Sequence, residues 1–346
     1  MGIADHPAAS ANRVAEFGAL DAARFRDEIA GGNLPVVLRG QVKNWRAVER
    51  AHAGDRALAE YLAGFGGGKP LEVLIGPPEI SGRFFYRDDM QGFNFQRQHV
   101  PLPNLVGELL KLAEQEAEAP HAIYANAAAA PEHLPGWQEA NPLDLPPADA
   151  VPRLWIGNAT QVATHFDASP NLAVCVAGRR RFTLFPPEQL ENLYLGPLDN
   201  TLAGPPNSMV DPDAPDLERY PRFAEALANA QVAELGPGDA LFIPAIWWHH
   251  VRAFDRFNVL VNYWWAYDNS ATPFVALVHA LMSVRDLPPA QKKAWRVWFD
   301  HLVFGDDAAD AAAHLPDHAK GVMGPASRER TEKIRHYLLM TLSGRG

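Results

Sequence analysis

The stretch that decides the fold is Gly238–Val251, which reads "GDALFIPAIWWHHV". It indicates a turn, a short apolar strand and then a second strand that carries two adjacent histidines. Side chains alternate between the two faces of a strand, so His249 shares a face with Val251 whereas His250 shares the opposite face with Arg252. Because Arg252 should point to solvent or to a sheet edge, we predict that His249 faces the interior of the fold.

Outside this stretch, three regions with different expected secondary structure follow one another. From about His121 to Tyr267, short apolar strands alternate with Gly- and Pro-containing turns, which is typical of a β-sandwich or barrel. The region before it mixes expected helices with expected strands, and the region after Pro273 is helical. The expected helices are 20–30, 55–65, 102–115, 273–287, 289–304 and 328–342, and the expected N-terminal strands are 34–40, 71–76 and 83–88. The sequence therefore predicts a mainly β fold with flanking helices, mixed α/β elements at the N-terminus and a helical C-terminal tail.

Composition narrows the class of protein. The chain has 346 residues and a formal net charge of -10, which argues against a nucleic-acid binder because such proteins usually present a basic face. No stretch approaches the length of apolar sequence that a membrane span needs. The N-terminal "MGIADHPAAS" lacks the features of a secretion signal, and the single Cys175 suits a reducing compartment. We expect a cytoplasmic protein that binds neither nucleic acid nor membrane.

A second motif supplies partners for His249. The segment 162–171 reads "VATHFDASPN", in which His165 and Asp167 are two residues apart and share one face of an extended chain. Two histidines and one carboxylate form the facial triad of non-haem iron enzymes, which leaves positions open for a cosubstrate and oxygen. An H-x-D pair alone occurs readily by chance, so the prediction rests on its combination with the stretch around His249.

These residues occur in a longer pattern. The motifs "HFDASPN", "GRRRFTLFPPEQLENLY", "GDALFIPAIWWHHV" and "VNYWW" resemble the JmjC or cupin-like oxygenases, in the branch similar to the asparaginyl hydroxylase of hypoxia-inducible factor. The resemblance spans about Ala15 to Tyr267. It implies a double-stranded β-helix (jelly roll) core at about 121–267 within a domain of residues 1–270. It also implies Fe(II) held by His165, Asp167 and His249, with 2-oxoglutarate as cosubstrate and O2 as oxidant.

The same resemblance suggests which residues bind 2-oxoglutarate. The family usually places a lysine on the strand after the glycine turn to hold the far carboxylate, and here that position is Arg180. A guanidinium can hold a carboxylate through two hydrogen bonds, so the change is chemically tolerable. Alternation places Arg180 on one face with Phe182 and Leu184, which favours an inward direction. Tyr124 matches the family tyrosine that reaches the same carboxylate.

Three further residues are implied by the resemblance. Asn171 and Asn262 match the amides that flank the cosubstrate, and Trp264 is expected to line the pocket. Val162 stands where related hydroxylases often carry a threonine that bonds the cosubstrate. Together with Arg180, Val162 leaves the mode of cosubstrate binding open.

The sequence therefore favours one function and leaves two others. The favoured one is an Fe(II)- and 2-oxoglutarate-dependent dioxygenase that hydroxylates an unidentified substrate. The resemblance suggests a peptide or protein side chain, and small molecules stay open. The alternatives are a metal-binding cupin without oxygenase activity, such as an isomerase or a sensor that uses Zn or Mn, and a binding scaffold without turnover.

The helical tail, residues 271–346, is expected to pair two copies of the chain. Its helices carry apolar stripes that exceed what the outer wall of a barrel is expected to cover, and related hydroxylases pair through C-terminal helices. The residues in these stripes are Phe274, Leu277, Leu281, Trp295, Trp298, Leu302, Ile334, Tyr337, Leu338 and Leu342. A homodimer is therefore predicted, with packing of the tail on its own barrel as the alternative.

Overall fold

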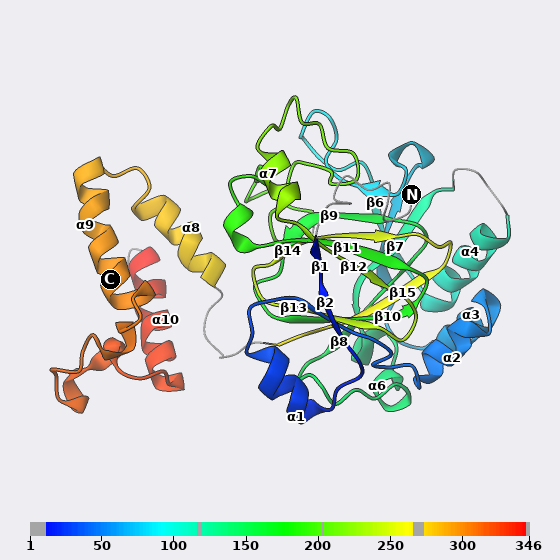
Figure 1. The fold of residues 1–346 in the computed structure, drawn as a ribbon, viewed down its shortest axis with the longest axis horizontal. Coiled ribbons are helices and arrows are strands. Elements are labelled where there is room, and N and C mark those ends of the chain that lie inside the picture. Colours follow the sequence, from blue (N-terminus) through cyan, green and yellow to red (C-terminus); the bar gives the residue numbers. More distant parts are fainter. Residues whose placement is uncertain (1–11, 116–119, 203, 266–272, 344–346) are drawn as a thin grey trace. The chain divides into compact units, whose positions relative to one another are not determined.

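The computed structural model describes residues 12–115, 120–202, 204–265 and 273–343. The chain divides into two compact units, Met1–Trp265 and Ala266–Gly346, which are described separately. The first is mainly β with flanking helices, so the predicted fold class is confirmed (Figure 1). The domain boundary expected between residues 270 and 271 lies outside the described residues. Within the described part of the chain, no helix has the length and apolar character needed to cross a membrane.

Eight strands form the core of the first unit in two layers. One layer has the order β13-β10-β15-β8 and the other has the order β12-β11-β14-β9, and along the chain the strands cross repeatedly between the layers. This crossing pattern is that of a double-stranded β-helix. The strands are β8 (Pro152–Gly157), β9 (Gln161–Phe166), β10 (Asn171–Ala177), β11 (Arg180–Phe185), β12 (Gln231–Leu235), β13 (Ala240–Ile243), β14 (Trp248–Ala253) and β15 (Asn258–Trp264).

Further strands extend both layers into a six-stranded and a nine-stranded sheet. In the larger sheet, β2 and β3 continue beyond β13, and β7, β4 and β6 continue beyond β8; in the smaller sheet, β1 and β5 are the edges. The polar β6 was not expected from the sequence because it lacks apolar alternation, and it forms by pairing with β4. The bounds are β1 (Asn12–Arg13), β2 (Ala15–Phe17), β3 (Val36–Leu38), β4 (Leu71–Gly76), β5 (Arg83–Phe84), β6 (Gln96–Val100) and β7 (Ala122–Ala129).

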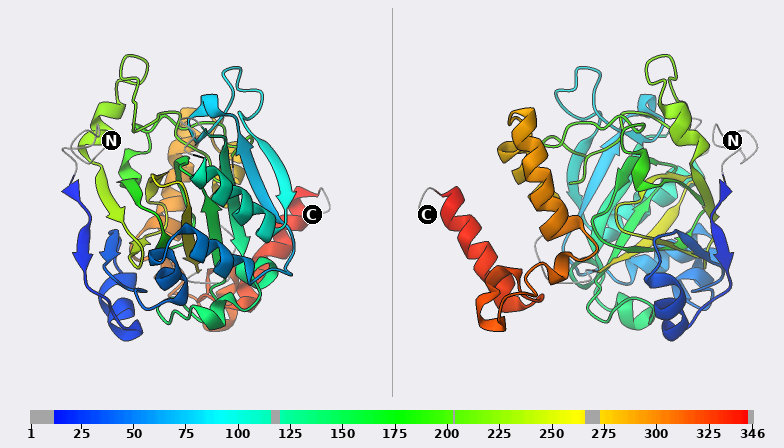
Figure 2. Two further views of the ribbon diagram at one scale, coloured as in Figure 1. Left: turned by 90° about the vertical axis from the view of Figure 1, so that its right-hand side faces the viewer. Right: turned by 60° about the vertical axis from the view of Figure 1, so that its left-hand side comes forward.

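Helices cover the outer face of the larger sheet (Figure 2). Their apolar residues form one buried cluster with the outward-facing residues of β8, β10 and β15. The helix expected at 20–30 is a short α-helix continued by a π-helix, and its Phe25 and Ile29 are buried in this cluster. The helical segments of the unit are α1 (Ala22–Arg24), η2 (Phe25–Ala30), α2 (Arg46–His52), α3 (Asp55–Ala63), η3 (Pro78–Ile80), α4 (Leu102–Glu114), α5 (Ala130–His133), α6 (Trp137–Ala140), η4 (Pro187–Gln189) and α7 (Phe223–Ala228).

The space between the two sheets is apolar over most of its length. Phe182 and Leu184 of β11 lie there with Val251 of β14, as strand alternation predicts. Gly178, in the turn before β11, has φ +74°, and a Cβ added to it would lie 2.1 Å from the side-chain oxygen of Asn258. Only glycine fits this turn, which sets the position of Arg180 at the start of β11.

The outer face of the smaller sheet is also covered. Segment 186–230, which connects β11 to β12 and includes α7, packs its Phe223 and Val210 against Phe185 and Trp248. We expected Arg252 to point to solvent or to a sheet edge; its side chain is 30% exposed on the outer face, although β14 is not an edge strand. It lies in β14, which has β11 and β9 on either side, and the covering segment reaches its side chain.

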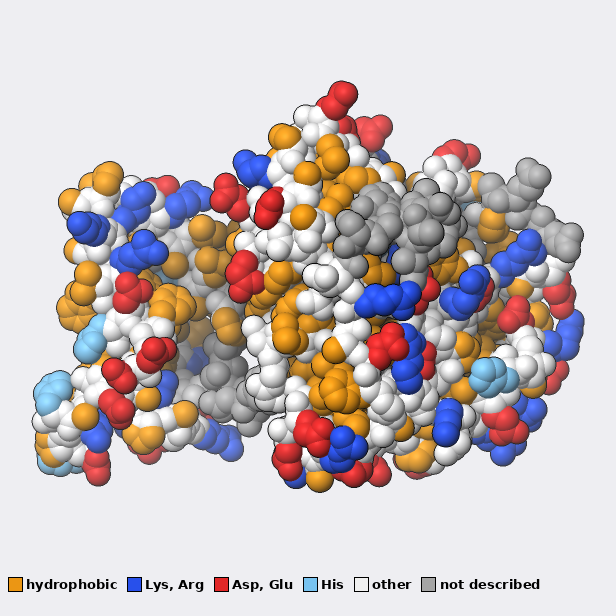
Figure 3. All heavy atoms as spheres, in the orientation of Figure 1, with side chains coloured by type: hydrophobic (Ala, Val, Ile, Leu, Met, Phe, Trp, Pro, Cys, Tyr) orange, Lys and Arg blue, Asp and Glu red, His pale blue; other side chains and the backbone are white. Residues whose placement is uncertain are grey.

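The second unit contains α8 (Pro273–Ser283), α9 (Pro289–Phe299), η5 (Asp300–Phe304), η6 (Ala308–Asp310), η7 (Asp317–Ala319), η8 (Gly321–Met323) and α10 (Arg328–Leu342). None of the described residues in α8, α9 or α10 is buried. Large apolar side chains therefore lie at the surface of this unit, where Figure 3 shows many of them.

Candidate metal centre

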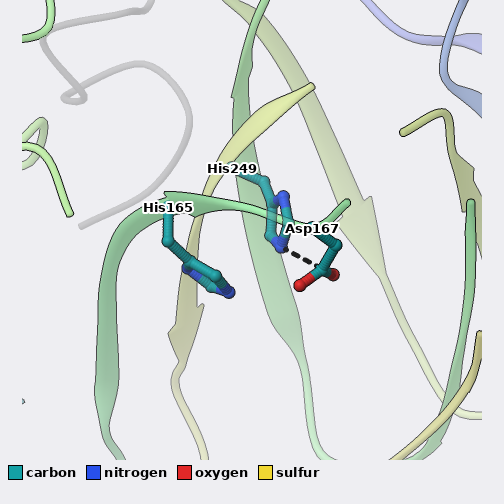
Figure 4. A group of neighbouring side chains, drawn as sticks. All are labelled: His165, Asp167 and His249. Atoms are coloured by element: carbon teal, nitrogen blue, oxygen red, sulfur yellow. Dashed lines mark ion pairs between the residues drawn. The ribbon is translucent and has the colours of Figure 1, made fainter. Parts of the chain in front are cut away.

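The structure brings His165, Asp167 and His249 together. His165 lies near the end of β9 and Asp167 follows that strand, while His249 lies in β14 directly opposite His165 in the strand register. One ligand atom from each residue lies within 4.8 Å of the others. Figure 4 shows the three side chains converging from two neighbouring strands. This is the arrangement that a facial triad requires.

Backbone hydrogen bonds orient both imidazole rings. Nδ1 of His165 is 2.9 Å from the carbonyl oxygen of Ala163, and Nδ1 of His249 is 3.1 Å from that of Trp247. A carbonyl oxygen only accepts, so Nδ1 carries the hydrogen and Nε2 keeps its lone pair for a metal. Burial, with a smaller contribution from His165, lowers the pKa of His249 to about 4, so the ring is neutral near pH 7.

The carboxylate of Asp167 is held by other predicted site residues. Its Oδ2 accepts hydrogen bonds from Nε1 of Trp264 at 2.9 Å and from Nδ2 of Asn171 at 3.1 Å. Asn262 in turn donates from Nδ2 to Oδ1 of Asn171 at 2.8 Å. The sequence suggested cosubstrate contacts for these three residues. The structure gives them a supporting role around Asp167, a predicted metal ligand, and their contact with a cosubstrate stays a prediction.

Arg180 and Tyr124 meet in the interior. The Arg180 residue is 2% exposed, and the hydroxyl oxygen of Tyr124 accepts a hydrogen bond from its guanidinium. Burial lowers the pKa of Arg180 and raises the pKa of Tyr124 above its usual range. Among the described residues, no carboxylate pairs with this guanidinium, and its Nε lacks a hydrogen-bond partner. A buried cation in this state is suited to an anionic ligand.

A pocket opens beside His165. Tyr124 and Val162 line it, together with aromatic side chains of β5 and β8. Two residues that sequence reasoning missed, Gln161 and Asn207, also line it. Gln161 lies four residues before His165 on the same strand, but the register of β9 shifts between Val162 and His165, so strand alternation does not predict its position. Asn207 lies in segment 186–230, which covers the outer face of the smaller sheet, and no sequence periodicity predicts its position.

The comparison with known families agrees with this geometry. The family described as the cupin-like domain matches residues 22–271, which is more than half of the chain. The chain belongs to the cupin-like domain family. The expected resemblance to JmjC and cupin-like proteins is therefore confirmed.

Several curated relatives of this cupin-like chain carry enzyme names. It is 40% identical over 105 residues to the tRNA wybutosine-synthesizing protein 5 of Danio rerio, and this match covers 30% of this chain and 29% of that protein. It is 37% identical over 112 residues to the lysine-specific demethylase JMJ31 of Arabidopsis thaliana, covering 32% of this chain and 20% of that protein. It is 25% identical over 255 residues to the lysine-specific demethylase 8 of Xenopus tropicalis, and the match covers 70% of this chain and 50% of that protein. The chain thus spans half or less of the length of each relative.

A second group of potential ligands lies on the other face of β14. Asp211, Asp213 and His250 also bring one ligand atom each within 4.8 Å of the others. Here the acidic groups already have cationic partners. Oδ1 of Asp213 is 2.8 Å from Nη2 of Arg181, and its Oδ2 is 2.5 Å from Nη1 of Arg252. This cluster is therefore a buried ion-pair network that ties the covering segment to the sheet.

Proposed function

We propose that this cupin-like chain is an Fe(II)- and 2-oxoglutarate-dependent dioxygenase that hydroxylates a peptide or protein side chain. The observation that carries the proposal is the pair of imidazoles whose Nδ1 atoms are fixed by carbonyls, leaving both Nε2 atoms beside the Asp167 carboxylate. Neutral nitrogen and carboxylate donors on one face, with other positions open, suit non-haem Fe(II). Relatives named as demethylases and as a tRNA-modifying protein support enzymatic chemistry at this fold.

In this proposal, His165, Asp167 and His249 hold the iron, and Arg180 with Tyr124 binds the far carboxylate of 2-oxoglutarate. When bound, the iron and 2-oxoglutarate supply the activation of O2 that hydroxylation needs. The protein fixes the geometry. Trp264 and Asn171 hold Oδ2 of Asp167, so its orientation does not depend on the metal. Burial keeps His249 unprotonated and therefore available as a ligand near pH 7.

Anaerobic reconstitution tests this function. The purified chain is loaded with Fe(II) under nitrogen, mixed with 2-oxoglutarate and exposed to O2, and succinate is measured. Succinate that requires both Fe(II) and O2 supports the dioxygenase. Tight metal binding without any succinate would instead favour a metal-binding cupin that is not an oxygenase, and no metal binding would favour a scaffold.

We also propose that the chain is a cytoplasmic homodimer. Its single cysteine, Cys175, is buried and free, which suits a reducing compartment. In the second unit, Trp298 is 61% exposed and Phe304 is 74% exposed, although both are large apolar side chains. A second copy of the same unit would cover such side chains through a self-complementary interface.

Light scattering on the full chain, and on a shorter chain ending at Asn269, tests the dimer. The full chain should scatter as a dimer at micromolar concentration, and the shorter chain as a monomer. A monomeric full chain would end the proposal, and a dimeric shorter chain would place the interface in the first unit.

A further inference from the structure

A second concave surface lies on the other side of β5 from the pocket beside His165. Phe84 of β5 lines that pocket, whereas its neighbour Arg83 lines this cleft. One wall of the cleft is segment 79–94, and the other is part of the covering segment, residues 209–220. Its volume is about 920 Å³, which is at the upper end of the range for ligand sites.

Three arginines that line the cleft have unused hydrogen-bond donors. They are Arg83, Arg87 and Arg219, and among the described residues none of their guanidiniums donates a hydrogen bond. The shortest ion-pair contacts of Arg83 and Arg87 run through Nε, at 3.3 and 3.7 Å. Elsewhere in the unit, Nη atoms of Arg39 and Arg97 contact carboxylates at 2.6 and 2.8 Å. The Nη atoms in the cleft are therefore available to a ligand.

Arg83 is the arginine best prepared for binding. Its guanidinium carbon lies over the ring of Phe85, 4.0 Å from the centroid, and its side chain is 29% exposed. Burial lowers the pKa of Arg83, because the cation has lost part of its hydration. A guanidinium held flat on a ring keeps its planar fork in one direction, which suits a carboxylate that accepts two hydrogen bonds.

The carboxylates that line the same cleft do not satisfy these donors. Asp211 lies beside Nε of Arg83, and its Oδ1 accepts a hydrogen bond from the backbone N–H of Asp213 at 2.9 Å. Glu79 and Asp88 are exposed, so water hydrates them and salt screens them. The half-buried Arg83 lacks such hydration and gains more from an ion of opposite charge.

The cleft is less suited to a nucleic acid than to a polypeptide. Single-stranded nucleic acids bind largely by stacking bases on exposed aromatic rings. Phe85 is only 8% exposed and lies under Arg83, while Tyr220 has the guanidinium of Arg219 over it at 5.2 Å. The net charge of -10 also opposes the approach of a phosphate backbone.

We propose that this cleft docks an acidic segment of a polypeptide, whose side-chain carboxylates are bound by the guanidiniums of Arg83, Arg87 and Arg219. Three cations in one cleft favour a segment with several acidic side chains. The proposal rests on the proposed function only where it takes this polypeptide to be the substrate. Because the cleft and the pocket beside His165 lie on opposite sides of β5, docking leaves the pocket free for 2-oxoglutarate.

Fluorescence anisotropy tests the docking site. The full chain, with saturating 2-oxoglutarate to occupy Arg180, is titrated into fluorescein-labelled hexaglutamate, hexalysine and hexauridylate RNA. Hexaglutamate should bind most tightly, and its binding should weaken as salt is raised, because salt screens charges at a protein surface. The metal is not needed, so His249→Ala should bind hexaglutamate as tightly as the unaltered chain.

Three variants locate the binding. Arg83→Gln should weaken hexaglutamate binding roughly ten-fold or more, the loss expected for hydrogen bonds between charged groups. Arg83→Lys keeps the charge but not the fork, and it should recover only part of this loss. Arg219→Gln, at an exposed position, should weaken binding by a smaller factor. Arg46→Gln removes the same charge from an exposed position of α2, outside the cleft, and should change nothing.

Each result has a defined meaning. Preference for hexaglutamate that falls in Arg83→Gln and Arg219→Gln, but not in Arg46→Gln, supports the proposal. Equal binding of hexalysine or RNA, an equal loss in Arg46→Gln, or no binding overturns it, and Arg219→Gln decides if Arg83→Gln does not fold. Loss of binding in His249→Ala would place the peptide at the metal and also overturn it. Absence of succinate formation, by contrast, would be a failure of the proposed function and would leave the peptide titration unchanged.

Discussion

The two faces of the smaller sheet carry the same types of residue, but the charged groups have oppositely charged partners on only one of them. On β14, His249 faces the interior beside Asp167, while His250 faces the covering segment beside Asp213. On β11, Arg180 is buried inside without a carboxylate partner among the described residues, while its neighbour Arg181 is buried outside and paired with Asp213. Composition and burial are alike on the two faces, and the pairing of charges differs.

This difference favours the inner face as the metal and cosubstrate site. On the outer face, Arg181 and Arg252 satisfy both oxygens of Asp213, so the cluster is complete and needs no further ligand. On the inner face, the buried Arg180 has no carboxylate partner among the described residues, and two imidazoles that are oriented through Nδ1 leave Nε2 for a ligand, a state that is typical of ligand sites. Proximity of histidine and aspartate is therefore a weaker guide to a metal site than the balance of charge around them.

Substitution of the adjacent histidines gives the largest expected contrast. His249→Ala should abolish Fe(II) binding, because it removes one of three predicted ligands, whereas His250→Ala should largely spare it. Anaerobic titration with Fe(II), followed by its absorption in the presence of 2-oxoglutarate, measures this. Equal losses in the two variants, or the reverse order, would show that the faces of β14 are wrongly assigned.

The outer cluster should matter for stability instead. Asp213→Asn leaves the guanidinium of Arg181 buried beside a neutral group, and breaking a buried pair of this kind costs about 3–5 kcal/mol in the free energy of unfolding. Asp211→Asn is the matched control, because this carboxylate is more exposed and its contact with Arg83 is longer, at 3.3 Å. Urea unfolding measures both. An Asp213 variant of unchanged stability that loses Fe(II) would assign the outer cluster to the metal.

The neighbouring arginines of β11 test the comparison on a smaller scale. Arg180→Ala should raise the apparent KM for 2-oxoglutarate about ten- to hundred-fold, the loss expected for a hydrogen bond between charged groups, with Fe(II) affinity nearly intact. Arg179→Ala is the control, since its side chain is exposed and paired with Asp255. Initial rates of succinate formation give both values. Equal KM values for the two variants, or a bound 2-oxoglutarate whose far carboxylate lies elsewhere, would contradict the assignment.

The support around Asp167 should produce the smallest effect. Trp264→Phe keeps the ring but removes the Nε1 hydrogen bond to Oδ2, and loss of such an outer partner lowers metal affinity by about ten-fold or somewhat more. Competition between Fe(II) and a chelator measures the change. Trp155→Phe is a useful control, because Nε1 of Trp155 has no hydrogen-bond partner. An unchanged affinity in Trp264→Phe would limit Trp264 to packing.

Much of the inner face followed from the sequence. Strand alternation has a fixed period of two, so the positions of His249, Val251 and Phe182 relative to one another were determined once the strands were recognised. The same period separated Arg180 from Arg181. The family motifs added the partners of His249, which lie too far along the chain for any local pattern to connect them.

The outer face, by contrast, was decided by tertiary structure. Alternation predicts which side chains leave the interior, but not which protein groups they meet there. Arg252 is partly exposed, as expected, yet it also pairs with Asp213 of the covering segment. Segment 186–230 has no periodic pattern that reveals its docking on β14, yet it brings Asp213 to two arginines and Asn207 to the pocket. Backbone geometry fixes direction locally, whereas pairing of buried charges depends on contacts between distant parts of the chain, so only the folded structure separates the site from the ion-pair network.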